Sequence, residues 1–252
     1  MSTTLDVTAY EHILTATIQR PEAMNAINFE LMDELERVLD HLENSRMRAF
    51  VLTGAGRDLF VSGGDLKEFH GIKSADEAEQ MARRMGAILK RIERLPCWTI
   101  ASINGSTYGG GWELMLAFDF RIASADATFH FSQGKFYLPP GWGGLTRLVE
   151  KVGRSTALRW LAETAEIDAG KALNYGLIDR LCPPDERTEQ TYDWAKEMCK
   201  NDRDYIKTLK QGALAFSEAR WKAIEQEIQP FARLWEDERH HTRVEKFLNK
   251  KD

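Results

Sequence analysis

The chain has 252 residues, of which 43% are hydrophobic, and its 34 basic and 39 acidic residues give a formal net charge of −5 at pH 7. That apolar fraction can build a sizeable core, so a chain that is disordered throughout is excluded. Both charge signs are mixed along the sequence without a long basic run, and nucleic acid is therefore not an expected partner.

Three cysteines are present, Cys97, Cys182 and Cys199, an odd number without the spacing of metal ligands. We expect reduced structural thiols and no metal site. The first residues form neither an apolar signal core nor an Arg-rich presequence, and no apolar run approaches the length of a membrane span. These features predict a soluble, cytoplasmic protein without membrane contact.

Strands and helices alternate in the first hundred residues. The pattern predicts a strand over Ile13–Ile18, a helix capped by Asn28, and a second strand over residues 49–53. A capping box that begins at Ser74 predicts another helix, which Pro96 ends. Repeated strand-to-helix passages of this kind favour an α/β fold with parallel strands.

The next strand, over Trp98–Ile103, runs into a glycine-rich turn at residues 104–111 that is followed by a helix. A strand, a glycine turn and a helix in this order point backbone N–H groups toward a ligand. Further along, we expect a regular strand over residues 129–133, which carries Gln133.

From residue 155 onward the periodicity is mainly helical. Ser155 and Asp168 are typical helix N-caps. His240 and His241 lie in a charged helix, where we expect both to be exposed.

Three sequence motifs are spaced along the chain: RPEAMNA at residues 20–26, FVSGGDLK at residues 60–67 and NGSTYGGGWE at residues 104–113. Together they resemble the enoyl-CoA hydratase/isomerase family, also called the crotonase superfamily. The resemblance continues in register from about Thr15 to the C-terminus. Each motif alone is weak, whereas the combination is specific.

This resemblance implies a fold and an assembly. Residues 1–182 would form an α/β core, a ClpP-like crotonase spiral of repeated ββα units. Residues 183–252, beginning at the Pro183-Pro184 linker, would form a C-terminal helical region that trimerises, giving a homotrimer or a dimer of trimers. The expected substrate is an acyl-CoA thioester, in which coenzyme A is part of the substrate, and no separate cofactor is expected.

The glycine run from Gly109 to Gly111 has a backbone cost of about 0.5–1 kcal/mol per glycine relative to alanine, which a need for close backbone approach would explain. In the family, two backbone N–H groups form an oxyanion hole for the thioester oxygen, and the resemblance places them at Ser62 and Gly110. The other substrate-binding positions that it implies are Ala23, Met24, Gly63, Gly64, Asp65, Leu66, Gly109 and Trp142. Asp65 is also a typical cap for a short helix.

Family hydratases hold and activate water with two glutamates, and the first matches Glu113. A structural role for Glu113, as a first-turn carboxylate that the helix dipole favours, is the competing interpretation. The second position, counted back from the PGWGG motif at residues 140–144, is Gln133. Glutamine is no general acid or base, although it can orient a water or a carboxylate, and residues 129–144 contain no carboxylate.

Decarboxylation of a malonyl-type thioester needs an oxyanion hole but no second carboxylate, because loss of CO2 yields the enolate directly. Residues 142–150 also resemble the ethylmalonyl-CoA decarboxylase-like members of the family. We therefore expect a decarboxylating lyase with Glu113 and Gln133 as its catalytic side chains. Two alternatives stay open: an enoyl-CoA hydratase that adds water with Glu113 alone, and a catalytically weak homologue that binds acyl-CoA.

Overall fold

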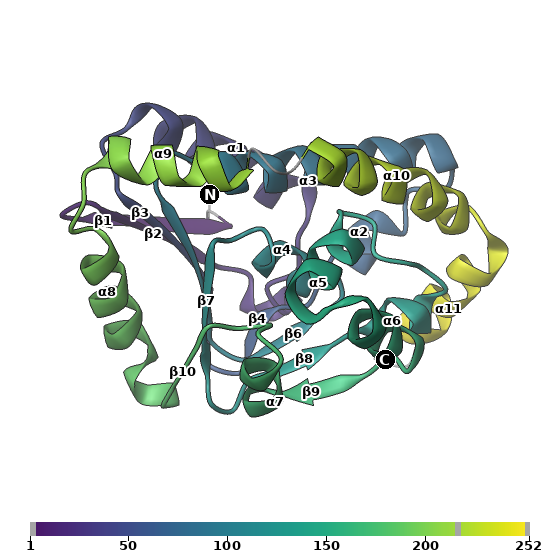
Figure 1. The fold of residues 1–252 in the computed structure, drawn as a ribbon. Helices are drawn as coiled ribbons and strands as arrows, with labels where there is room; N and C mark the ends of the chain where they lie inside the picture. Colours follow the sequence, from purple (N-terminus) through teal and green to yellow (C-terminus); the bar gives the residue numbers. More distant parts are fainter. Residues whose placement is uncertain (1–3, 215–217, 250–252) are drawn as a thin grey trace.

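The computed structural model describes residues 4–214 and 218–249, and its strands form two sheets (Figure 1). The larger sheet has six strands in the order β1-β2-β3-β5-β7-β10, and the smaller has four in the order β4-β6-β8-β9. The strands of the larger sheet are β1 (Leu5–Tyr10), β2 (Ile13–Ile18), β3 (Ala49–Gly54), β5 (Trp98–Ile103), β7 (Phe120–Ser124) and β10 (Arg180–Cys182). Those of the smaller sheet are β4 (Leu59–Val61), β6 (Ser106–Tyr108), β8 (Thr128–His130) and β9 (Glu166–Asp168).

Strand pairing in the larger sheet is parallel except between β1 and β2, which confirms the expected parallel α/β class. Consecutive strands go to different sheets: β3, β5 and β7 lie in the larger sheet, and β4, β6 and β8, which follow them, lie in the smaller one. Helical segments follow each of these pairs. The core is therefore the spiral of repeated ββα units that the motifs predict.

The helical segments up to β10 are η1 (Pro21–Ala23), α1 (Phe29–Asn44), α2 (Leu66–Phe69), α3 (Ala75–Arg94), α4 (Gly110–Met115), η2 (Ser132–Phe136), α5 (Gly144–Val152), α6 (Arg154–Ala162) and α7 (Ala169–Asn174). Those after β10 are η3 (Pro184–Glu186), α8 (Arg187–Met198), α9 (Arg203–Leu214), α10 (Glu218–Trp235) and α11 (Glu238–Leu248). Within residues 4–214 and 218–249, every helix is too short or too polar to cross a membrane.

Local signals in the sequence set the ends of several helices. Asn28 accepts a hydrogen bond from the Leu31 N–H (2.9 Å) at the start of α1, and Ser74 and Glu77 form the expected capping box of α3. Asp168 caps α7 as expected.

Two sequence predictions about local structure are wrong. Ser155 does not cap a helix, because Gly153 (φ 78°) turns the chain directly from α5 into α6. The strand expected over residues 129–133 ends at residue 130, and the chain then enters η2, so Gln133 lies on a 3-10 helix.

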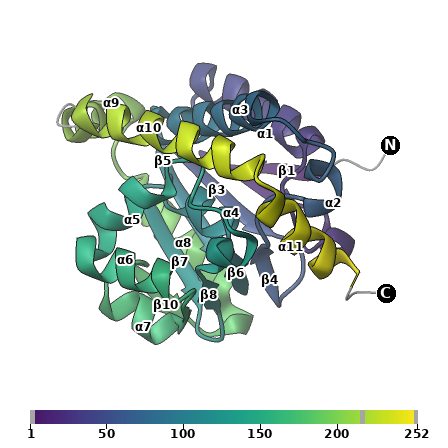
Figure 2. The same cartoon turned by 90° about the vertical axis from the view of Figure 1, so that its right-hand side faces the viewer.

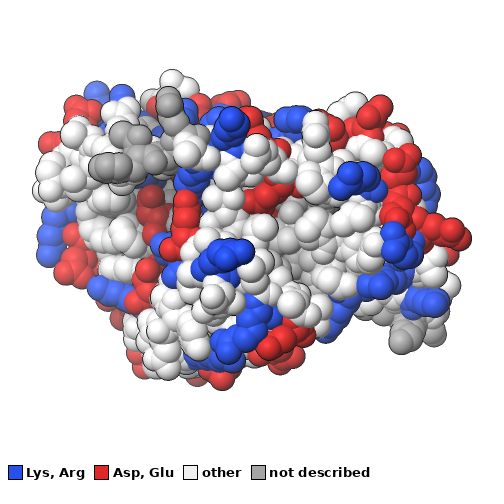
Figure 3. Space-filling view, turned by 45° about the vertical axis from the view of Figure 1, so that its right-hand side comes forward, with Lys and Arg blue, Asp and Glu red and all other residues white. Residues whose placement is uncertain are grey.

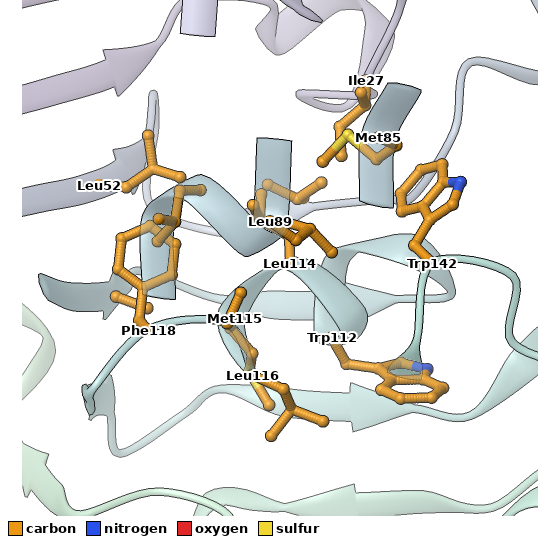
Figure 4. Close-up of a cluster of buried hydrophobic side chains, with 14 of the residues drawn as sticks. Ile27, Leu52, Met85, Leu89, Trp112, Leu114, Met115, Leu116, Phe118 and Trp142 are labelled. Carbon is orange, nitrogen blue, oxygen red and sulfur yellow. The ribbon is translucent and has the colours of Figure 1, made fainter. Parts of the chain in front are cut away.

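Apolar side chains cover both faces of the larger sheet because they alternate along its strands. Leu14 and Phe50 belong to the main core together with the apolar residues of α1 and α3, whereas Ile13 and Val51 pack with residues of α8. Figure 1 shows α8 at one flank of this sheet, apart from α1 and α3. Figure 4 shows α4 within the main core, into which its Trp112 projects. The core thus holds the short helix that follows the glycine turn.

Charged side chains of both signs are interspersed over the face shown in Figure 3. Cys97, Cys182 and Cys199 are free and buried. In the described part of the chain, no group of three or more His, Cys, Asp or Glu side chains is arranged to hold a metal ion.

Candidate active site

A pocket of about 90 Å³ lies where the two glycine turns, α4 and η2 meet α10. It is lined by Ser62, Gly63, Gly64, Leu66, Phe69, Met81, Gly109, Gly110, Glu113, Ser132, Gln133, Phe136, Leu138, Pro139, Gly141, Trp142, Phe231 and Trp235. Among these described residues, Glu113 is the only one with an ionisable side chain. The site therefore offers one carboxyl group, backbone N–H groups and largely apolar walls.

The two glycine turns approach each other so closely that side chains are excluded. A Cβ built on Gly63, where φ is +103°, would lie 3.1 Å from the Gly110 nitrogen, and one on Gly111 would lie 2.2 Å from the Val61 carbonyl oxygen. A Cβ on Gly110 would lie 2.1 Å from Cζ3 of Trp142. Close approach of neighbouring groups therefore explains why Gly63, Gly110 and Gly111 are glycines.

The two backbone N–H groups expected at the oxyanion hole differ in whether they already donate a hydrogen bond. Gly110 is the first residue of α4, a position without an intrahelical acceptor, and the described residues provide no other acceptor for its N–H. The Ser62 N–H instead donates to the Met24 carbonyl oxygen (3.2 Å), because Met24 turns into the left-handed region (φ 55°) after η1. An anionic oxygen can bind the Gly110 N–H directly, but at Ser62 it must share or displace this carbonyl.

Glu113 is buried on the first turn of α4, facing the turn that precedes α5. Its Oε2 accepts hydrogen bonds from the N–H groups of Trp142 (2.8 Å) and Gly144 (3.0 Å), and its Oε1 accepts one from Gly141 (3.3 Å). A Cβ on Gly144 would lie 2.4 Å from Cγ of Glu113, so this glycine makes room for the carboxylate. Burial raises the pKa of Glu113 to about 7, although these hydrogen bonds favour the charged form.

Gln133 lies beside Glu113, and two partners set the orientation of its amide. Its Oε1 accepts from Nε1 of the buried Trp112 (3.2 Å), and its Nε2 donates to Oε1 of Glu113 (3.2 Å). An amide nitrogen carries two hydrogens, so a second N–H of Gln133 is available in the pocket that this residue lines.

The turn that holds Glu113 is itself supported by three helices. The buried Arg147 of α5 donates from Nη1 to the Trp142 carbonyl (2.7 Å) and from Nε to Glu93 of α3 (2.9 Å). Arg220 of α10 also pairs with Glu93 (2.6 Å). Glu227 of α10 accepts from two backbone N–H groups at the start of α5 (3.1 and 2.8 Å). The catalytic candidates are thus fixed by the C-terminal helices as well as by the core.

Residues 8–252 match the family model of enoyl-CoA hydratase/isomerase. The chain belongs to the enoyl-CoA hydratase/isomerase family. This confirms the family that the three motifs indicate. The substrates of that family are acyl-CoA thioesters.

Two family relatives differ in the reaction that their names state. The chain is 32% identical over 200 residues to a short-chain-enoyl-CoA hydratase of Clostridium acetobutylicum, covering 79% of this chain and 76% of that protein. It is 33% identical over 218 residues to an ethylmalonyl-CoA decarboxylase of Mus musculus, covering 84% of this chain and 66% of that protein. A solved enoyl-CoA hydratase from Bacillus anthracis is 26% identical and superposes with a TM-score of 0.82 over 98% of this chain and 96% of that chain.

Most positions expected from the family motifs come together in the pocket. Those that line it are Ser62, Gly63, Gly64, Leu66, Gly109, Gly110, Glu113, Gln133 and Trp142. Ala23, Met24 and Asp65 do not line it. Ala23 belongs to η1, and the Met24 side chain is 41% exposed. Asp65 instead caps α2 and pairs with Arg20 (2.8 Å), so its role in the structure is that of a helix cap.

Sequence reasoning missed the aromatic residues that close the pocket. They are Phe69, Phe136, Phe231 and Trp235. The only local signal for the last two is their spacing of four, which places both on one face of α10. The expectation of an exposed His240 is also wrong: its ring is buried, and Nδ1 lies 2.9 Å from the Phe136 carbonyl oxygen. This contact fastens α11 to η2, which carries Gln133.

Proposed function

We propose that this protein is a lyase that decarboxylates a malonyl-type acyl-CoA thioester. The observation that carries the proposal is the lining of the pocket. Among its described residues Glu113 is the single ionisable side chain, and Gln133 takes the place of the second glutamate of family hydratases. Family relatives named ethylmalonyl-CoA decarboxylase support the same reaction.

In the proposed reaction the thioester oxygen accepts hydrogen bonds from the N–H groups of Gly110 and Ser62, with the Met24 carbonyl giving way at Ser62. The bond between Cα and the carboxylate breaks, CO2 leaves, and the electron pair forms the enolate, whose oxygen these two N–H groups stabilise. The described lining contains no cationic side chain. A substrate carboxylate is therefore poorly solvated there, which favours its conversion to neutral CO2.

Glu113 is the proposed proton donor to the enolate carbon. With a pKa of about 7, a substantial fraction of this carboxyl group is protonated at neutral pH, and water restores the proton after each turnover. Gln133 holds the carboxyl group through Nε2, and its second N–H can orient the substrate carboxylate before it leaves. Coenzyme A arrives as part of the substrate, and the reaction needs no other cofactor.

Hydration of a short enoyl-CoA is the second candidate, and the pKa of Glu113 is the observation that favours it. A carboxyl group that titrates near pH 7 can accept a proton from water and return it to the substrate. The Clostridium relative supports this reaction by its name. A third candidate, acyl-CoA binding with little catalysis, is favoured by the hydrogen bond that already occupies the Ser62 N–H.

One experiment separates these candidates. The protein is incubated with methylmalonyl-, ethylmalonyl- and crotonyl-CoA, and loss of CO2 and addition of water are followed by mass spectrometry. We expect loss of CO2 from the two malonyl-type thioesters, and we expect Glu113→Gln to bind them with kcat lowered by a factor of about 10²–10⁴. Turnover of crotonyl-CoA alone would overturn decarboxylation, whereas tight binding without any turnover would favour the third candidate.

The proposal extends to the assembly, a homotrimer or a dimer of trimers in the cytoplasm, on the basis of the family alone. Sedimentation velocity of the full chain tests it, with an expected species of three or six chains. A stable monomer at enzyme concentrations used for assay would contradict this part of the proposal.

A further inference from the structure

Trp142 and Phe231 are two walls of the pocket that a substrate acyl group would enter. We infer that these side chains restrict the enzyme to short acyl groups, an inference that rests on the proposed acyl-CoA function. The pocket has a volume of about 90 Å³. Trp142 and Phe231 line it together with Gly110, whose N–H would bind the thioester oxygen.

The first wall, the Trp142 indole, lies against both glycine turns. A Cβ built on Gly110 would lie 2.1 Å from its Cζ3, and one on Gly64 would lie 3.8 Å from its Cη2. The Trp142 backbone is fixed on both sides, since its N–H donates to Glu113 (2.8 Å) and its carbonyl accepts from Arg147 (2.7 Å). The residue is 5% exposed. The indole is therefore a fixed boundary beside the Gly110 N–H.

The second wall comes from α10. A Cβ on Gly141 would lie 2.3 Å from Cδ2 of Phe231, so this ring packs directly on the backbone that precedes Trp142. Phe231 packs in turn against Trp235 (ring centroids 5.4 Å apart), whose Nε1 donates to the Ile72 carbonyl (3.1 Å). This contact joins the part of α10 that carries Phe231 to the loop after α2.

Chain length can be tested without any reaction. In an open apolar channel each added CH2 tightens binding about fourfold, because its burial contributes about 0.8 kcal/mol. In a closed pocket the added CH2 groups stay outside, and the affinity stops rising. A series of saturated acyl-CoA thioesters, which the proposed reaction cannot consume, therefore measures the depth of the pocket.

Isothermal titration calorimetry with acetyl-, butyryl-, hexanoyl- and octanoyl-CoA is the test. For the wild type we expect the affinity to rise to butyryl-CoA and then to level off. In Trp142→Ala and Phe231→Leu the rise should continue to hexanoyl-CoA, by about fifteenfold over butyryl-CoA. Trp142→Phe, which keeps an aromatic wall, should shift the plateau less and covers the case in which Trp142→Ala does not fold. Trp221→Ala, on α10 but outside the lining, is the matched control and should leave the series unchanged.

The outcomes distinguish the size limit from the function on which it rests. A wild-type affinity that keeps rising through octanoyl-CoA would overturn the size limit and leave acyl-CoA binding intact. A plateau that none of the Trp142 and Phe231 variants moves would overturn the assignment to these walls. Absence of binding for every thioester would overturn the proposed function, and the size limit with it.

Discussion

Glu113 is under two opposing influences at the residue scale. Burial raises its pKa to about 7, whereas three backbone N–H groups and the Gln133 amide stabilise its charged form. The carboxyl group therefore changes its protonation state near neutral pH, in the same pocket as the open Gly110 N–H. In its protonated form Glu113 can donate a proton to the substrate, and in its ionised form it can accept one.

The direction of the pH dependence follows from the proposed role. If Glu113 donates the proton, kcat for decarboxylation is highest below pH 7 and falls as the pH rises through the pKa of about 7. Glu113→Gln should lower kcat by a factor of about 10²–10⁴ and abolish this step in the profile. The pH profile of CO2 release measures both. A rate that rises through pH 7 would identify the carboxylate as a base, as the hydratase candidate requires.

Gln133→Glu restores the second carboxyl group of family hydratases. Two carboxyl groups at hydrogen-bond distance share one proton, because both cannot readily ionise together. We expect hydration of crotonyl-CoA to rise by about 10²-fold and decarboxylation to fall, as measured by mass spectrometry of both products. Gln133→Leu is the matched control, since it removes the amide without adding a carboxyl group and should gain no hydration. A Gln133→Glu variant with unchanged decarboxylation would remove Gln133 from the mechanism.

At the scale of elements, the sequence predicts those helix starts that depend on hydrogen-bond partners nearby in the chain. Asn28 and Ser74 find their hydrogen-bond partners within one helical turn, so the starts of α1 and α3 are predictable. The motifs likewise locate the glycine turns, which follow the neighbouring strands β4 and β6 of the smaller sheet. Gln133 lies on a 3-10 helix that no local pattern indicates, and Phe231 becomes a pocket wall by packing on the distant Gly141, which its spacing from Trp235 does not reveal. Family position identifies Gln133, but only the fold shows how it is held.

The cluster of Glu93, Arg147 and Arg220 joins α3, α5 and α10 beneath the turn that carries Trp142. Burial acts to raise the pKa of Glu93, but Arg147 and Arg220 lower it overall. A carboxyl group whose pKa is lowered by folding adds stability above its unfolded value of 4.5. That contribution is lost as the pH falls through the folded pKa, so this cluster weakens in acid.

Arg147→Met removes one of the two arginine partners of the buried Glu93 carboxylate and should lower the free energy of unfolding by about 3 kcal/mol at neutral pH. The loss should shrink as the pH falls below 4.5, because Glu93 then becomes protonated in the variant. Urea unfolding at several pH values measures both effects. Arg91→Met is the matched control: Arg91 lies on the side of α3 that faces α1, where it pairs with the exposed Asp40 and Glu43, and its replacement should cost about 0–1 kcal/mol. Equal losses of unfolding free energy in the two variants would show that the buried cluster stabilises the protein no more than an exposed ion pair does.

On the scale of the whole molecule, α10 joins the C-terminal helices to the core at the pocket itself. Figure 2 shows it crossing the molecule beside α3 and leading into α11. It supplies Glu227 to the start of α5 and Phe231 and Trp235 to the pocket walls. The domain boundary after residue 182 stays a prediction from the sequence. The pocket draws residues from both sides of it, so residues 1–182 alone would lack part of the site.

A chain with such a pocket should unfold as one unit, and a ligand should stabilise all of it. At a concentration of about 100 times its Kd, a ligand adds about 2.7 kcal/mol to the free energy of unfolding. For a chain of this size that raises Tm by roughly 5–10 °C. Differential scanning calorimetry should therefore show a single transition that butyryl-CoA moves upward, with free coenzyme A as the control that lacks the acyl group and shifts it less. Two transitions, of which butyryl-CoA moved only one, would mean that the C-terminal helices fold on their own and that α10 does not complete the binding site.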